Sequence, residues 1–145
     1  MIRRTLLCLL LLMSVGVAGT AVRAADPPGE ADSAAIRGVI DSQIEAFRRD
    51  DGETAFSFAA PSIRHMFGTV ENFMGMVRGG YRPVYRPQSY RFGAITIIDG
   101  LIVQKVHIVG PDGRAVTAFY MMEKQPDGTW RIAGCSLGAP EEQSA

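Results

Sequence analysis

Three Asp-Gly pairs punctuate the C-terminal half of the chain and limit what it can fold into. Asp99-Gly100, Asp112-Gly113 and Asp127-Gly128 separate segments in which apolar residues alternate with other residues. Asp-Gly pairs between alternating segments are typical of tight hairpin turns. The sequence after Pro87 therefore predicts four antiparallel strands joined in order, which together form a meander.

The N-terminal half has helical periodicity instead. Apolar residues recur there every three or four positions from Ser33 onward, which predicts a helix with one buried face. Its predicted N-cap is Asp32 or Ser33. The residues of this apolar stripe are Ile36, Ile40, Ile44 and Phe47.

Two shorter helices are predicted before the strands. One covers 53–60 and ends at Pro61, and the next begins near Thr69 and ends at Gly79-Gly80. Helices followed by a meander indicate the α+β class. We expect three N-terminal helices packed on one face of a curved four-stranded antiparallel sheet.

The first residues have the order of a secretory signal peptide. Two arginines precede an apolar run from Leu6 to Val17, and small residues follow around Ala24. We interpret 1–24 as a signal peptide, with an uncleaved membrane anchor as the alternative. The protein is then periplasmic or secreted, without membrane association after cleavage. The remaining parts are a linker (25–32), a single domain (33–138) and a polar tail (139–145).

Charge and cysteine content narrow the function classes. Cleavage after residue 24 would remove three of the 15 basic residues and none of the 15 acidic ones, which leaves a formal charge of about −3. A net negative charge argues against a nucleic-acid partner. Cys135 would be the one cysteine left, so no internal disulfide is expected and the domain depends on apolar packing.

Turn lengths decide which residues share a sheet face. We take the first turn as two residues, which pairs Ile98 with Leu101, and the other two as four residues, which pairs Val109 with Arg114 and Lys124 with Thr129. The predicted core face collects Ile95, Ile97, Ile102, Val106, Ile108, Phe119, Met121, Trp130 and Ile132. The predicted outer face collects Tyr90, Phe92, Thr96, Val103, Lys105, His107, Val109, Val116, Tyr120, Met122, Arg131 and Leu137, with Cys135 beside Ala118.

Two functional expectations follow from these faces. The outer face is too apolar for an ordinary wetted surface, so a second copy of the chain is the expected cover and a homodimer the expected assembly. The core face also carries polar or rim residues that could anchor a small anionic or partly apolar ligand. The predicted ligand-binding residues are Arg91, Gln104, Thr117, Ser136 and Trp130.

Several stretches resemble a known family. "VIDSQIEAFRRDD", "MVRGGYRPVYRP" and "DGTWRIAGCSL" resemble a bacterial family catalogued as domain of unknown function 4864, and the likeness covers 36–137. The order of elements also resembles the nuclear transport factor 2-like superfamily. This resemblance implies a cone-shaped fold with a pocket between helices and sheet, frequent dimerisation through the open sheet face, and both enzymes and non-enzymes. The first family implies no established activity.

A pocket enzyme is the alternative to a non-catalytic binding or interaction module. A lyase, isomerase or hydrolase needs an acid–base group in the pocket, and His65 and Glu123 are the candidates. We expect His107 at the outer-face interface instead. The two histidines have no metal-ligand spacing, and the turn aspartates are engaged by their own turns.

No metal or cofactor is expected. Met66, Met74 and Met76 lie near His65 in the sequence and could suggest a site for monovalent copper. Flexible thioethers are more often used to fill irregular gaps in a core, and we prefer that interpretation.

The segment "GYRPVYRPQSYRF", 80–92, contains three Tyr-Arg pairs. Prolines hold the residues before them extended, so the segment predicts a stiff connector from the third helix to the first strand, with tyrosines packed and arginines in water. The alternative is an anion site in which Arg91 acts with Arg78 or Arg82. The sequence names neither a ligand nor a partner.

Overall fold

A computed structural model describes residues 26–141 of the chain, so the predicted signal peptide lies outside the described residues. The helices are α1 (Glu30–Arg48), α2 (Gly52–Ser57), α3 (Pro61–Phe67), α4 (Val70–Gly80) and α5 (Arg82–Tyr85). The strands are β1 (Ser89–Ile98), β2 (Leu101–Val109), β3 (Ala115–Lys124) and β4 (Trp130–Gly138). The α+β class is confirmed, with five helices where three were expected.

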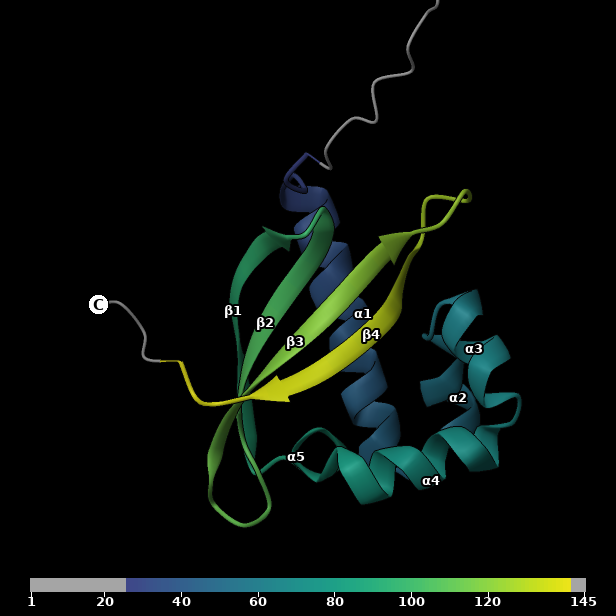
Figure 1. The fold of residues 1–145 in the computed structure, drawn as a ribbon, viewed down its shortest axis with the longest axis vertical. Coiled ribbons are helices and arrows are strands. Elements are labelled where there is room, and N and C mark those ends of the chain that lie inside the picture. The colour runs from purple at the N-terminus through teal and green to yellow at the C-terminus, as the bar shows by residue number, and fades with distance from the viewer. Residues whose placement is uncertain (1–25, 142–145) are drawn as a thin grey trace, which may run out of the picture.

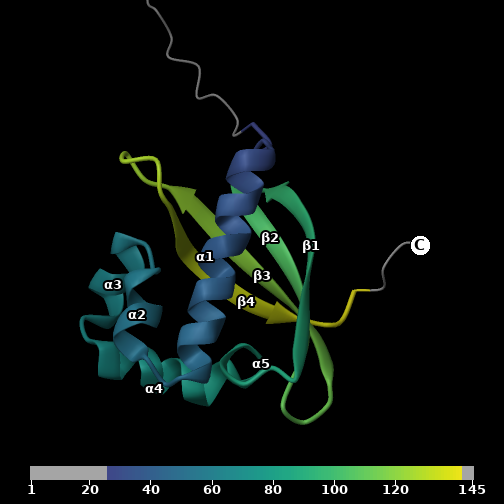
Figure 2. The ribbon, with the colours of Figure 1, turned by 180° about the vertical axis from the view of Figure 1, so that it is seen from behind.

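The strands form one open antiparallel sheet in the order β1-β2-β3-β4, as predicted. α1 crosses one face of this sheet, and α2, α3 and α4 gather beside β4 (Figure 1). The view from behind shows α1 in front of the strands, so the helices cover a single face (Figure 2). Within residues 26–141 the other face carries no helix.

The apolar stripe of α1 is buried as predicted. Ile36, Ile40 and Ile44 are 0% exposed and Phe47 is 2% exposed. Burying each of these side chains stabilises the fold by about 1.5–3 kcal/mol. The helix begins at Glu30, where the extended Gly29 precedes it without a side-chain cap. The expected cap at Asp32 or Ser33 is therefore wrong.

Two of the three turns are one residue longer than expected. The Asp99-Gly100 turn has two residues as predicted, and Ile98 pairs with Leu101. In the other two turns, Val109 pairs with Ala115 and Lys124 pairs with Trp130, so each loop has five residues. The cause is the glycine of each Pro-Asp-Gly sequence, because Gly113 and Gly128 have φ of 79° and 86°. A left-handed glycine after a Pro-Asp turn adds one residue before pairing resumes.

The sheet also contains two irregularities that the sequence analysis did not include. Pairing between β1 and β2 shifts between Phe92 and Ile95, and pairing between β3 and β4 shifts where Met122 meets Ile132. A bulge of this kind reverses which face the following side chains occupy.

Together the turns and bulges correct the assignment of faces. Trp130 points toward the helices and His107 away from them, as predicted. β3 is reversed, because its helix-facing residues are those predicted to point outward. Residues predicted to point outward that pack in or against the core instead are Tyr90, Phe92, Val116, Tyr120, Met122, Cys135 and Leu137.

Candidate ligand-binding cavity

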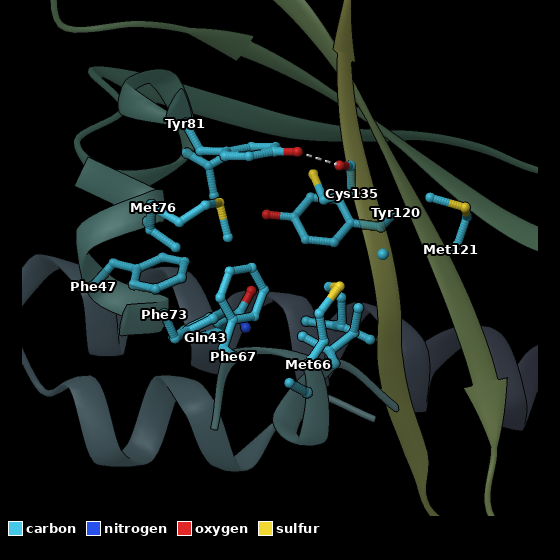
Figure 3. A pocket seen from close by; sticks show the side chains of 16 residues that line it. Gln43, Phe47, Met66, Phe67, Phe73, Met76, Tyr81, Tyr120, Met121 and Cys135 are labelled. Carbon is cyan, nitrogen blue, oxygen red and sulfur yellow. Dashed lines mark hydrogen bonds between the residues drawn. The ribbon is translucent and has the colours of Figure 1, made fainter. Parts of the chain in front are cut away.

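An apolar cavity of about 340 Å³ lies among α3, α4 and the strands β3 and β4 (Figure 3). Its walls come from helices and sheet together, so it sits on the helix-covered side of the sheet. The lining residues are Gln43, Phe47, Ala59, Ile63, Met66, Phe67, Phe73, Met76, Val77, Tyr81, Val84, Tyr120, Met121, Ile132, Gly134 and Cys135.

Local sequence signals place the two helices that form one wall. Pro61 occupies the first turn of α3, where a missing N–H costs nothing, and Gly68 ends that helix with φ of 74°. Thr69 then caps α4 by accepting a hydrogen bond from the Asn72 backbone N–H at 3.2 Å. No residue of α3 is fully buried, so this helix covers the cavity rather than filling it.

Aromatic rings form one wall of the cavity. The Phe73 ring lies 6.2 Å from the ring of Phe47, 4.9 Å from that of Phe56 and 5.8 Å from that of Phe67. The Phe67 contact is edge-on, with an interplanar angle of 72°. Such packing holds the rings in fixed orientations. The wall is therefore a rigid aromatic surface.

Polar groups in the cavity are few, and among the side-chain oxygens and nitrogens of its lining residues only the Tyr120 hydroxyl is both fully buried and unpaired. The Gln43 amide donates to the Ala55 carbonyl at 3.1 Å. The Tyr81 hydroxyl donates to the Cys135 carbonyl at 2.8 Å, the dashed line in Figure 3. Tyr120 is 1% exposed, and its hydroxyl has no hydrogen-bond partner in the structure. Figure 3 shows that hydroxyl directed into the cavity, toward Met76 and Tyr81.

The titratable groups of the cavity are held neutral. Burial raises the pKa of the Tyr120 hydroxyl well above its usual value of 10. Burial also raises the pKa of the Cys135 thiol to about 12. The residues that line the cavity include no Asp, Glu, Lys, Arg or His. The cavity thus suits an uncharged guest and offers no group that exchanges protons near neutral pH.

The structure does not bring the five predicted ligand-binding residues together in this cavity. Gln104 is fully buried on the helix side, but its amide donates to the Gly93 carbonyl at 2.9 Å and supports the β1 bulge. Trp130 also faces the helices, where its indole N–H donates to Asp32 Oδ1 at 3.0 Å. Arg91 pairs with His107 across the strands and lies on the outer face.

Thr117 and Ser136 were placed on the wrong face. Thr117 is buried on the outer side, where its hydroxyl accepts a hydrogen bond from the Glu141 backbone N–H at 3.1 Å. Ser136 pairs with Phe119 and is exposed. The five-residue turn before β3 and the bulge in β4 explain these two errors.

The acid–base candidates do not meet in the cavity. His65 is exposed on α3, and Glu123 is exposed near the end of β3. Glu123 Oε1 accepts a hydrogen bond from the Gln125 amide at 3.1 Å. His107 lies on the outer face, 3.5 Å from the Thr117 hydroxyl. The geometry therefore gives the enzyme alternative no buried acid–base pair at His65 and Glu123.

The Tyr-Arg segment is a packing element. The expected extended conformation is wrong for 82–85, which form the helical turn α5. The tyrosines pack as predicted: the hydroxyls of Tyr85 and Tyr90 donate to Asp50 and Asp41, and both acceptors lie on or next to α1. Arg91, on the outer face, does not join an arginine cluster at the cavity.

Three cavity residues were missed or misplaced by the sequence analysis. Gln43 lies between the stripe residues Ile40 and Ile44, and this spacing was a usable signal. Tyr120 and Cys135 were assigned to the outer face because turn and bulge lengths were wrong. Of the methionines, Met74 is buried as core filler, as preferred above.

Comparisons with known proteins add one match. The family described as a domain of unknown function (DUF4864) matches residues 29–145. No curated protein and no solved structure matches the chain significantly. Among the described residues, no helix is long and apolar enough to cross a membrane.

Proposed function

The chain belongs to the family described as a domain of unknown function (DUF4864), and we propose that it binds a small, mostly apolar molecule without catalysing a reaction. The ligand occupies the cavity beneath α3 and α4. The cavity itself is the observation that carries this proposal.

Size and lining support the proposal. Natural ligand pockets start at about 300 Å³, and a dry apolar cavity of about 150 Å³ is enough to bind benzene. A cavity of about 340 Å³ is large enough for one or two rings. The thioether of Met66, which is 66% exposed, lies at the rim. A flexible side chain there can move aside to let a ligand enter.

The expected anionic ligand is not the one this cavity favours. An ionised carboxylate loses its hydration on burial and needs a charged or multiple hydrogen-bonding partner in return. The lining offers neither. The partly apolar ligand of our prediction is the better fit.

A neutral naphthalene dye whose emission shifts to the blue in apolar surroundings, 6-propionyl-2-(dimethylamino)naphthalene, tests the proposal. We expect saturable binding with one dye per chain. Ile63→Trp places a larger side chain at a lining position and weakens binding at least about 10-fold, the effect of about 1.4 kcal/mol. Arg114→Trp, at an exposed position in the turn between β2 and β3, leaves binding unchanged. No saturable binding by the unmodified protein would remove the proposal.

The second part of the proposal is a homodimer through the outer sheet face. Phe119, which pairs with Lys105, lies on that face and is half-buried. Ile98 and Leu101 add exposed apolar surface at the β1–β2 turn, with 43% and 50% of their surface accessible. We expect the solution mass to be twice the chain mass and to fall to one chain in Phe119→Lys. An unmodified monomer ends the dimer proposal.

We also propose that the protein is exported and that it belongs to the nuclear transport factor 2-like superfamily. A signal peptide at 1–24 predicts that protein recovered from a secreting host begins at residue 25. A mature N-terminus at Met1 would contradict it. The cone of the nuclear transport factor 2-like superfamily is supported by helices on one face of an antiparallel meander.

A further inference from the structure

We infer that Tyr120 selects an uncharged, ring-containing ligand by donating its hydroxyl hydrogen to an acceptor oxygen on that ligand, as in an aryl ketone, aldehyde or ester. This inference rests on the proposed function, because it names the chemical class of the molecule in the same cavity.

The Tyr120 hydroxyl lacks a hydrogen-bond partner. Tyr120 is 1% exposed and its oxygen makes no hydrogen bond in the structure. Buried polar groups are nearly always paired, so an unpaired one calls for an explanation. The hydroxyl is directed from the sheet into the cavity, toward Met76 and Tyr81 (Figure 3). A ligand in that space would supply the partner that the protein does not.

The partner that the Tyr120 hydroxyl needs is a hydrogen-bond acceptor. A phenol has one hydrogen to donate, and leaving a buried donor unpaired is costly. The neighbouring Cys135 carbonyl already accepts the Tyr81 hydroxyl at 2.8 Å. The sulfur atoms of Cys135 and Met76, which also line the cavity, are only weak acceptors. The hydroxyl makes no hydrogen bond to the amide oxygen of Gln43 either, so an acceptor oxygen on the ligand would supply the missing partner.

The lining also limits the rest of the ligand to an uncharged, aromatic body. The lining has no charged side chain, so an ionised ligand would be buried without compensation. The rings of Phe47, Phe67 and Phe73 form one wall. Aromatic surfaces favour stacked or edge-on contact with another ring. An aromatic body with one carbonyl oxygen satisfies both the wall and the hydroxyl.

Two probes of nearly the same shape test the inference. 2-Acetylnaphthalene carries a carbonyl oxygen where 2-isopropenylnaphthalene carries a methylene group. We would measure the affinity of each by calorimetry for the unmodified protein, Tyr120→Phe and Tyr81→Phe. Tyr81→Phe is the matched control, because it removes a cavity hydroxyl that is already committed to Cys135. 2-Naphthoate serves as the charged probe.

We expect the ketone to bind the unmodified protein about 3- to 10-fold more tightly than the hydrocarbon, the effect of one net hydrogen bond. Tyr120→Phe removes that preference and leaves hydrocarbon affinity unchanged, whereas Tyr81→Phe keeps it. Naphthoate binds more weakly than the ketone. Equal binding of ketone and hydrocarbon, or naphthoate binding as tightly as the ketone, overturns the inference and leaves the proposed function standing. Binding of no probe overturns both.

Discussion

Asp32, in the first turn of α1, accepts a hydrogen bond from the indole Nε1 of Trp130 at the start of β4, at 3.0 Å. Nζ of Lys124 forms an ion pair with the same carboxylate, 3.1 Å from Asp32 Oδ1. The residue that the sequence suggested as a helix cap therefore joins the beginning of α1 to the far edge of the sheet.

This contact predicts an acid-dependent loss of stability. The hydrogen bonds from Trp130 and Lys124 lower the pKa of Asp32 from 3.8. A lowered folded-state pKa stabilises the fold above about pH 4, and that contribution is lost as the pH falls through the folded-state value. We expect Asp32→Asn to be less stable than the unmodified protein at pH 7, with the difference shrinking at pH 2–3.

Urea unfolding followed by the fluorescence of Trp130, the single tryptophan of the chain, measures this difference. Asp26→Asn, at an exposed position before α1, is the control and should leave the stability at pH 7 unchanged. A constant difference between Asp32→Asn and the unmodified protein from pH 7 to pH 2 would contradict the assigned role.

The two cavity tyrosines predict stability changes of opposite sign. Tyr120→Phe removes an unpaired buried hydroxyl and should stabilise the ligand-free protein by about 1 kcal/mol. Tyr81→Phe removes a hydroxyl that donates to the Cys135 carbonyl and should destabilise it by about 0.5–1.5 kcal/mol. Urea unfolding of the two variants provides the measurement. A destabilised Tyr120→Phe would show that the hydroxyl has a partner in the free protein.

The glycines also predict effects of opposite sign. Gly38 lies inside α1 with open space around it, so Gly38→Ala should stabilise by about 0.5–1 kcal/mol. A Cβ on Gly93 would lie 2.6 Å from His107 Nε2, so Gly93→Ala should destabilise by about 1–3 kcal/mol. Thermal unfolding of both variants distinguishes these signs. Similar effects of the two substitutions would mean that His107 does not pack on the β1 bulge.

Cys135 should react slowly with alkylating reagents. Burial raises its pKa from 9 to about 12, and the thiolate is the reactive form. At pH 8 a shift of about three units leaves about 1,000-fold less thiolate than in an unperturbed cysteine. Iodoacetamide labelling of the Cys135 peptide, followed by mass spectrometry, should be slow and slower still with saturating naphthalene dye. Labelling at the rate of a free thiol would place Cys135 outside the apolar cavity.

How far the sequence predicted the fold depended on the kind of signal. Helix periodicity was reliable, since every residue of the α1 stripe is buried. Strand number and order were also predicted, because Asp-Gly turns interrupt the alternation clearly. Both signals are local, and tertiary contacts did not override them.

Strand phase was less predictable, because an error of one residue reverses a whole face. The two five-residue turns cancel for Trp130, which is why its predicted direction is right although that of Tyr120 is wrong. The signal was present: proline before Asp-Gly favours a turn that ends in a left-handed glycine, as Gly113 and Gly128 show.

The bulges had weaker signals. Gly93 and Gly134 lie at the two positions where pairing shifts, and isolated strand glycines often mark a bulge. Because the shifts were not predicted, Arg91 and Ser136 were expected to face the helices and Cys135 to face outward. For that reason Arg91 and Ser136 lie on the outer face and not beside the cavity.

A crystal structure of the protein soaked with 2-acetylnaphthalene tests the central claim most directly. We predict that the naphthalene ring lies between Phe67 and Tyr120, with its carbonyl oxygen about 2.7–2.8 Å from the Tyr120 hydroxyl. Side chains that fill this space in the crystal, or a ligand bound only elsewhere, would contradict the claim.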